Sequence, residues 1–424
     1  MTQTTRNNYF IPFALVTSLF FLWAFVHNLE PILIPHLKKA CRLTDLESAL
    51  IDSAVYIGYF VMALPAGLVM KRFGYKAGIL VGLLMYGAGA LLFLPAADTR
   101  QYGMFLGALF VIASGCAFLE TAANPYVTML GPRGGAHTRI NFAQSFNGFG
   151  AFIAPFAGGL FILSGKEYSE EALAAMSPSD LETYLQMEAD AVKFPYLIIA
   201  LVVLFVAALV WFTKMPDGRT ATEGKSSGNL SQVLKHRQLK WGVVAQFFYV
   251  GAQVGVTSFF IRFSKYSSGV LEKEAAFWLS MALLGFMIGR FAGTFLSRFI
   301  PANRLLFIYA TCCIVLLTLA SLVKSELALW ALIVVPFFES IIFPTIFSLS
   351  IDNLKEDTEL GSSLVVMAIA GGAFFPLAMG WISDATGNIQ IAYLVPVACL
   401  LVVLWYSLDG YRANNISSSE KSSH

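Results

Sequence analysis

Three glutamates lie in strongly apolar stretches of the chain, where a carboxyl group can do chemistry that a surface carboxylate cannot. Glu120 lies in Cys-Ala-Phe-Leu-Glu-Thr-Ala-Ala-Asn-Pro-Tyr, Glu339 in Pro-Phe-Phe-Glu-Ser-Ile-Ile-Phe-Pro, and Glu30 in Trp-Ala-Phe-Val-His-Asn-Leu-Glu-Pro. An ionisable side chain at mid-membrane costs at least ~2.5–3.5 kcal/mol, so it normally faces a water-filled cavity or a partner. Such a carboxyl group can take up a proton on one side of a membrane and release it on the other. We predict cation coupling at these three residues; the alternative is a neutral acid that hydrogen-bonds a neighbouring helix.

Amide and aromatic side chains accompany these glutamates in the apolar stretches. Amides offer donors and acceptors that suit the hydroxyl groups of a neutral sugar, and flat aromatic rings suit the face of a pyranose. Gln144 and Asn147 share one helix face, as do Gln246 and Tyr249. Each of these residues alone could instead join two helices, but together they predict a sugar site. Its predicted members are Trp23, Asn28, Asn124, Gln144, Asn147, Gln246, Tyr249 and Gln253. His27 adjoins the suspected cavity, although core packing is the favoured interpretation, and Asp52 and Arg262 are expected to anchor interfaces near span ends.

The elements that must position these side chains are membrane-spanning helices. Of the 424 residues, 57% are hydrophobic and 13% are charged, whereas a soluble chain carries about 25% charged residues. A span needs about 20 mostly apolar residues. Twelve such runs are predicted, at residues 9–37, 49–70, 76–96, 102–129, 138–163, 194–213, 241–263, 275–298, 304–323, 327–350, 361–383 and 390–408. The fold class is therefore an all-α membrane protein.

Charge and polarity organise these spans into two halves of six. With both termini in the cytoplasm, basic residues on that side outnumber those outside by about two to one. Residues 214–240 are basic and rich in Ser and Gly, as a linker is. We expect an N-terminal bundle at 1–213, this linker, and a C-terminal bundle with a short tail at 241–424. The external stretch 164–193 contains Ser-Pro-Ser-Asp-Leu-Glu-Thr-Tyr-Leu-Gln-Met-Glu, which predicts a short surface helix.

The loops after the second span of each half resemble one another. Gly67-Leu-Val-Met-Lys-Arg-Phe-Gly-Tyr-Lys76 in the first half corresponds to Gly289-Arg-Phe-Ala-Gly-Thr-Phe-Leu-Ser-Arg298 in the second. Internal repeats of this kind occur in secondary transporters. The alternative explanation is the ordinary excess of basic residues in cytoplasmic loops.

Other functional classes find little support in the sequence. The net charge of +2 gives no reason to expect a nucleic acid partner, and the five cysteines have no metal-ligand spacing. The chain contains no His-Glu-x-x-His, Gly-x-Ser-x-Gly or P-loop motif, so an enzyme is not expected. We expect no cofactor and no metal site.

Several longer motifs identify a family. Ile-Pro-Phe-Ala-Leu near the start, Pro-Ala-Gly-Leu-Val-Met-Lys-Arg-Phe-Gly-Tyr-Lys-Ala-Gly-Ile, Leu-Glu-Thr-Ala-Ala-Asn-Pro-Tyr, Arg-Ile-Asn-Phe-Ala-Gln-Ser-Phe-Asn-Gly-Phe-Gly-Ala and Trp-Ile-Ser-Asp-Ala-Thr-Gly-Asn are among them. Over residues 9–408 the chain resembles the fucose–galactose–glucose–proton symporter family of the major facilitator superfamily. The resemblance implies two six-helix bundles around a central cavity, alternating access and cation-driven sugar uptake. It also implies a coupling role for Glu120 and sugar-cavity positions for Trp23, Asn28, Gln144 and Asn147.

The chain departs from the family pattern in two places. Where fucose-transporting members have Asn-Asn-Leu-Asn-Asp, this chain has His27-Asn28-Leu29-Glu30-Pro31, so Pro31 occupies the position of a proton-handling aspartate. A shift of one residue turns a side chain by about 100°, although Pro31 can distort the helix. Phe343 replaces a cavity tyrosine, and Glu339 adds a carboxyl group one turn away.

The resulting expectation is a monomeric secondary active transporter in a bacterial inner membrane. It would import a small neutral sugar, such as glucose, galactose or fucose, by symport with protons. Sodium coupling, an uncoupled facilitator, an exporter and a transporter-like sugar sensor remain alternatives.

Overall fold

The computed structural model describes residues 9–131, 136–163, 168, 170–216, 234–352, 354 and 358–412, and within these ranges it contains helices and no strand. The helices of the first half are α1 Phe10–Cys41, α2 Asp45–Ser48, α3 Leu50–Phe73, α4 Tyr75–Thr99, α5 Tyr102–Met129, α6 Ala136–Phe161, α7 Glu170–Ala174, α8 Pro178–Asp190 and α9 Lys193–Phe212. Those of the second half are α11 Arg237–Ser258, α12 Phe260–Ser268, α13 Glu272–Leu296, α14 Ala302–Leu322, α15 Glu326–Glu339, α16 Ile342–Ile351, α17 Thr358–Met367, η3 Ala368–Ala370, α18 Gly371–Thr386, α19 Ile389–Ala392, α20 Leu394–Trp405 and η4 Tyr406–Gly410.

All twelve predicted spans are helical. Ten helices are long and apolar enough to cross a membrane, and α11 with α12 forms an eleventh candidate that is bent by 53°. The twelfth position is α6, a helix of 26 residues whose polar residues, among them Gln144 and Asn147, keep it out of that apolar set. A helix that carries polar side chains through a membrane needs an interior surface to face.

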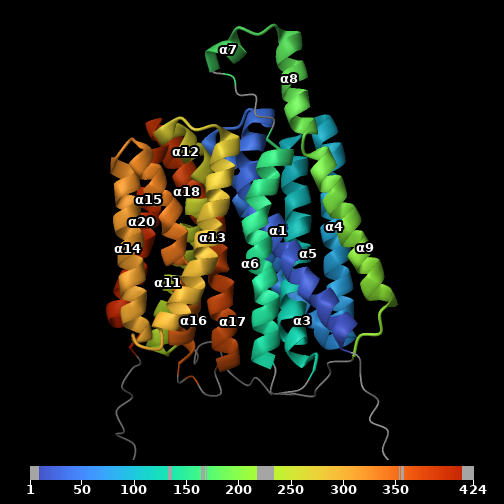
Figure 1. Cartoon of the computed structure of the whole chain (residues 1–424), viewed down its shortest axis with the longest axis vertical. Helices are drawn as coiled ribbons and strands as arrows, with labels where there is room; N and C mark the ends of the chain where they lie inside the picture. Colours follow the sequence, from blue (N-terminus) through green and yellow to red (C-terminus); the bar gives the residue numbers. More distant parts are fainter. Residues whose placement is uncertain are drawn as a thin grey trace, which may run out of the picture.

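The two halves lie side by side and repeat one packing scheme (Figure 1). In the first half α4 packs on α5 and α9, and α3 packs on α5; in the second, α14 packs on α15 and α20, and α13 packs on α15. Between the halves α6 contacts α13, and α18 contacts α2 and α3. The basic segment that repeats in the sequence falls at the α3–α4 and α13–α14 junctions, so the internal repeat is structural.

Helices α7 and α8 extend beyond one end of the bundle (Figure 1), and we name this end the α8 end. The predicted surface helix is confirmed as α8, whose first turn is capped by the Ser177 hydroxyl accepting a bond from the Asp180 amide. The short helix α2 lies at the same end, against α18. Most of the predicted linker, residues 217–233, lies outside the described residues.

Candidate functional site

A cavity of about 280 Å³ lies between the two halves. Both halves contribute polar and aromatic side chains to its wall. They include Trp23, His27, Asn28, Tyr56, Tyr59, Glu120 and Asn147 from the first half, and Gln253, Thr257, Phe286, Arg290, Glu339 and Phe343 from the second. The structure thus brings together Glu120, Glu339 and four of the eight predicted sugar-site residues, Trp23, Asn28, Asn147 and Gln253, with Phe343 beside them.

Glu339 is the most exceptional group in the cavity wall. Its side chain is 1% exposed, and within the described chain neither carboxyl oxygen has a hydrogen-bond partner. The Tyr249 hydroxyl donates to the Glu339 backbone carbonyl over 2.6 Å, which fixes the end of α15. Arg290 lines the same cavity, with its guanidinium over the Phe286 ring. A buried carboxyl group without a partner is costly, so this one is suited to a ligand that donates hydrogen bonds.

Two amides of the first half face the cavity from α1 and α6. The Asn28 amide donates to the Ala24 carbonyl over 2.8 Å, and Asn147 donates to the Phe20 carbonyl over 3.5 Å. Both bonds orient the amide groups through α1. Hydrogen-bonding side chains held in this way are preorganised for a polar ligand.

Four predicted sugar-site residues do not line the cavity. Asn124 and Gln144 bond each other over 3.5 Å, one helical turn from Glu120 and Asn147 respectively. Gln246 and Tyr249 are fully buried in the second half.

The lining stripe of α11 explains the positions of these last two residues. The stripe consists of Val250, Gln253, Val254 and Thr257. At 100° per residue, Tyr249 lies to one side of it, while Gln246 lies on the same face as the stripe, about one turn before Val250, at a depth where its side chain is fully buried. In this conformation both side chains pack within the second half and do not line the cavity.

Glu30 also lies outside the cavity wall. Helix α1 continues without interruption through Pro31 and Pro35, so Pro31 does not break the helix to turn Glu30 inward. Glu30 is 5% exposed and packs toward Asp52 of α3, with the two carboxyl groups close enough to share a hydrogen bond. His27, one turn earlier, occupies the cavity wall instead.

A polar cluster joins the two halves at the α8 end. The Arg262 guanidinium of α12 donates to Asp45 Oδ1 over 2.6 Å and to Ser48 Oγ over 2.8 Å, both on α2. Ser383 donates to Asp45 Oδ2 over 2.5 Å, and Asp384 accepts from the backbone amide of Asp45. We name Asp45, Ser48, Arg262, Ser383 and Asp384 the outer lock, since their bonds join the two halves at the end that the loop charges predict to face outward.

Deeper contacts continue the outer lock toward the cavity. The Ser258 hydroxyl donates to Asp52 Oδ2 over 2.6 Å, and the Ser53 hydroxyl donates to the Ala373 carbonyl over 2.7 Å. Asp52 and Arg262, which were expected to anchor interfaces near span ends, each bond a residue of the other half. Asp45 was missed, although Thr44 and Glu47 form a capping box that marks the start of α2 in the sequence.

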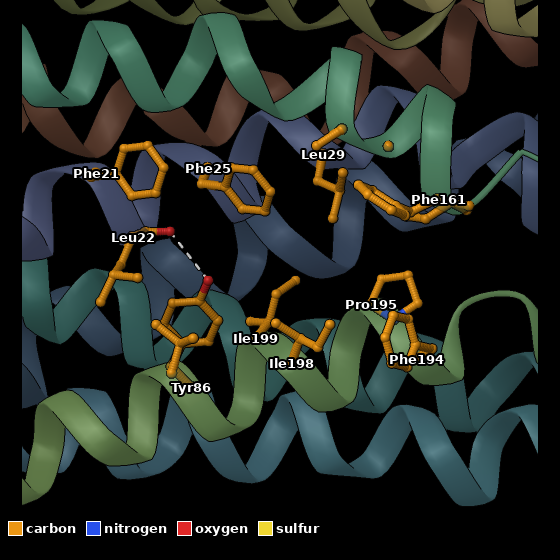
Figure 2. Close-up of a pocket in the computed structure, with 14 residues that line it drawn as sticks. Phe21, Leu22, Phe25, Leu29, Tyr86, Phe161, Phe194, Pro195, Ile198 and Ile199 are labelled. Atoms are coloured by element: carbon orange, nitrogen blue, oxygen red, sulfur yellow. Dashed lines mark hydrogen bonds between the residues drawn. The ribbon is translucent and has the colours of Figure 1, made fainter.

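A second hollow, of about 250 Å³, lies among α1, α4, α6 and α9. Figure 2 shows it lined by apolar side chains such as Phe21, Phe25 and Phe161. The Tyr86 hydroxyl donates to the Leu22 carbonyl over 3.1 Å and is therefore occupied. A sugar would find few hydrogen-bond partners here, so the central cavity is the candidate site.

Comparison with known proteins places this arrangement in a family. The model of the Major Facilitator Superfamily matches residues 14–375. The L-fucose-proton symporter of Escherichia coli K12 is 45% identical over 409 residues, covering 95% of this chain and 93% of the relative. A glucose/galactose transporter of Brucella abortus is 38% identical over 415 residues, covering 97% of each chain.

Solved structures agree with the sequence comparison. The crystal structure of the Escherichia coli fucose:proton symporter in its outward conformation has a TM-score of 0.67 and 43% identity, covering 94% of this chain and 98% of that one. A D-xylose-proton symporter, at 12% identity and a TM-score of 0.71, shares the fold. The expected fold class is confirmed, and none of these relatives is an enzyme. The chain belongs to the major facilitator superfamily, and within it to the family that contains the L-fucose-proton symporter and the glucose/galactose transporters.

Proposed function

We propose that this protein imports a small neutral sugar, a hexose or 6-deoxyhexose, together with protons, by alternating access. The observation that carries the proposal is the cavity between the halves, where carboxyl groups, amides and aromatic rings face one space. Relatives named as fucose and glucose/galactose carriers cover almost the whole chain. A polar cavity buried between two helical bundles suits a substrate that is rich in hydroxyl groups.

In this proposal the sugar lies between Asn28 and Asn147 of the first half and Gln253 and Glu339 of the second. The amides exchange hydrogen bonds with its hydroxyl groups. The unpartnered oxygens of Glu339 accept bonds from two further hydroxyls. Trp23, with Phe343 across the cavity, supplies the apolar surface for the ring.

Glu120 is the proposed coupling residue in the cavity wall. It faces the same space as the sugar, and Asn124 donates to its backbone carbonyl over 3.0 Å. A carboxyl group that is reached from opposite sides in two conformations can carry a proton across.

We also propose the orientation of the chain. The α8 end faces outward across a bacterial inner membrane, and both termini lie in the cytoplasm, as the distribution of basic loop residues predicts. The protein works as a monomer of two bundles, 1–213 and 241–424, joined by the linker 214–240. In this orientation the outer lock closes the external entrance.

The test is transport by the purified protein in liposomes. Uptake of radiolabelled L-fucose, D-galactose and D-glucose is measured with the pH gradient and the sodium gradient varied independently. We expect accumulation of at least one sugar when the outside is acidic, with or without sodium. Dependence on sodium alone would overturn proton coupling, and counterflow without accumulation would identify a facilitator. No counterflow of any of the three sugars would overturn the proposed substrate class.

A further inference from the structure

We propose that Glu30 and Asp52 form a carboxyl pair that holds one proton and acts as a second coupling site, loaded from the α8 end. The inference rests on the proposed function, because it names part of the proton pathway. It assigns a transport role to Asp52, which the sequence presented only as an interface anchor.

The first support is the geometry of the pair. Glu30 of α1 is 5% exposed and Asp52 of α3 is 2% exposed, and their carboxyl groups lie close enough to share one proton in a hydrogen bond. Two neighbouring carboxyl groups repel each other when both are ionised, so one shared proton stabilises the pair. Glu30 Oε1 is buried and has no hydrogen-bond donor among the residues that the structure describes.

The second support is a connection from the pair to the other half of the molecule. Asp52 Oδ2 accepts a 2.6 Å bond from Ser258, which ends α11. Glu30 and Asp52 both belong to the first half, and Ser258 belongs to the second. Separation of the halves at the α8 end breaks the Ser258 bond and opens the Asp52 side of the pair to external water. The pair therefore gains a proton when that end opens.

The third support is a connection from the pair to the cavity. His27 Nδ1 lies 3.9 Å from Glu30 Oε2, and His27 Nε2 lies 3.1 Å from the Tyr56 hydroxyl. His27 and Tyr56 both line the cavity. A small rotation of the imidazole brings Nδ1 to the carboxyl proton.

The proton of the pair reaches the cavity through His27. The Glu30 carboxyl group gives its proton to Nδ1 of a neutral His27, and Nε2 releases its own proton to water in the cavity. The pair is left as two carboxylates, and His27 is neutral in the tautomer that carries its proton on Nδ1. Proton exchange with cavity water then returns His27 to the Nε2-protonated tautomer before the next cycle. Repulsion between the carboxylates then favours reloading when the α8 end next opens.

The titratable groups around the pair leave it free to change its charge. They come from every helix packed around it and are His27 of α1, Tyr56 of α3, Tyr102 and Glu120 of α5, Tyr196 of α9 and Arg262 of α12. Arg262 already bonds Asp45 and Ser48. Its ion pair is with Asp45, and the described residues show none between Arg262 and either carboxyl group of the pair.

The experiment compares wild type, Asp52→Asn and Glu30→Gln in liposomes. Asp98→Asn is the matched control, since Asp98 is a carboxylate at the same end that pairs with Lys193. Sugar counterflow reports binding and conformational change, while alkalinisation of the medium on sugar addition reports proton uptake. Infrared difference spectra between acid and alkaline buffer report the carboxylic acid directly.

We expect Asp52→Asn to retain counterflow, to lose sugar-driven proton uptake and to lose one protonated carboxyl band from the wild-type difference spectrum. Asp98→Asn should match wild type in all three measurements. Unchanged proton uptake in Asp52→Asn would overturn the inference, because the amide still bonds Glu30 and Ser258. The inference would also be overturned if Asp52→Asn raised the sodium requirement of transport and left sugar-driven proton uptake intact. If Asp52→Asn does not fold, the infrared difference spectrum of wild type is the test. A carboxylic acid band that does not change between acid and alkaline buffer would show that no such pair titrates. Absence of counterflow in wild type would instead reject the proposed function.

Discussion

Removal of the Arg262 guanidinium should shift the protein toward the conformation that is open at the α8 end. Arg262→Met keeps most of the volume of the side-chain stem and removes the bonds to Asp45 and Ser48. The contact of the guanidinium with the Phe259 ring lies within the second half. The substitution removes this contact equally from the conformations that are open and closed at the α8 end, so its loss does not change their ratio.

The size of the shift follows from what remains around Asp45. Breaking a buried ion pair costs about 3–5 kcal/mol when it leaves a charge uncompensated. The Asp45 carboxylate would not be left uncompensated, because Lys38 and Ser383 still bond it, each over 2.5 Å. The relevant quantity is then a hydrogen bond to a charged group, about 1.5–3 kcal/mol. The ratio of open to closed molecules should rise by roughly 10- to 150-fold.

Cysteine labelling measures this ratio. Thr257→Cys places a thiol in the cavity wall, in a background where the five native cysteines are replaced. Right-side-out vesicles are treated with a membrane-impermeant maleimide, and Arg262→Met should increase the labelling rate by that factor. The control is Arg100→Met, which breaks a 2.5 Å ion pair with Glu182 within the first half. If the control increases labelling as much as Arg262→Met does, the outer lock does not set the equilibrium.

Four further substitutions test the cavity and the lock. Glu120→Gln should abolish uphill sugar accumulation and preserve counterflow; accumulation at the wild-type level would show that Glu120 does not couple. Asn147→Ala should weaken sugar binding by about 5- to 150-fold in titration calorimetry, because it leaves a sugar hydroxyl unpaired, whereas Gln144→Ala, outside the cavity wall, should have less effect. Gly380→Ala should also favour the open α8 end, since its Cβ would lie 2.7 Å from the Asp45 carbonyl oxygen and the Leu46 Cα; unchanged Thr257→Cys labelling would contradict this.

The spans could be predicted from the sequence because a membrane imposes one strong constraint on each of them. A long apolar helix satisfies its own backbone and needs no partner to be recognised. Helix α6 is the informative exception. Its polar residues lower its hydropathy, and it was found because charged residues and helix-breaking residues mark the ends of the run. One of the residues that make α6 hard to recognise, Asn147, also bonds α1 and lines the cavity.

The cavity wall was predicted only in part, since a sequence gives helix faces but not their rotation in the bundle. Asn28, Asn147 and Gln253 reach the cavity, whereas Gln246 and Tyr249 pack within the second half. The rotation of each helix depends on contacts with other helices, such as the Tyr249 bond to the Glu339 backbone. Nothing local to α11 distinguishes a buried amide from one that meets a ligand.

The partnership of Glu30 and Asp52 shows the same difficulty for charged residues. Glu30 stood out because it interrupts an apolar run, and its sequence neighbour Pro31 suggested a bend as the way to turn it inward. The structure solves the problem differently, by keeping α1 helical and bringing a second carboxyl group from α3. Two acids that share a proton are compatible with burial where one ionised acid is not. Such a pair is visible only once two helices are docked.

The contacts at the α8 end differ in kind from those inside each half, and this difference bears on movement. Within the first half, α4 and α9 meet through rings such as Phe93 and Tyr196, stacked 3.6 Å apart. Across the halves at the α8 end, the partners are Asp45 with Arg262, Asp52 with Ser258, and Lys39 with Glu272 over 2.8 Å. Polar groups exchange their partners for water at a net cost of about 0.5–1.5 kcal/mol per neutral hydrogen bond. Separating apolar surfaces would cost about 25 cal/mol for each Å² exposed to water, with nothing regained. The halves can therefore part at this end while each remains intact. Protonation of Asp52, which lies within this polar contact, can then bias the opening without unfolding any helix.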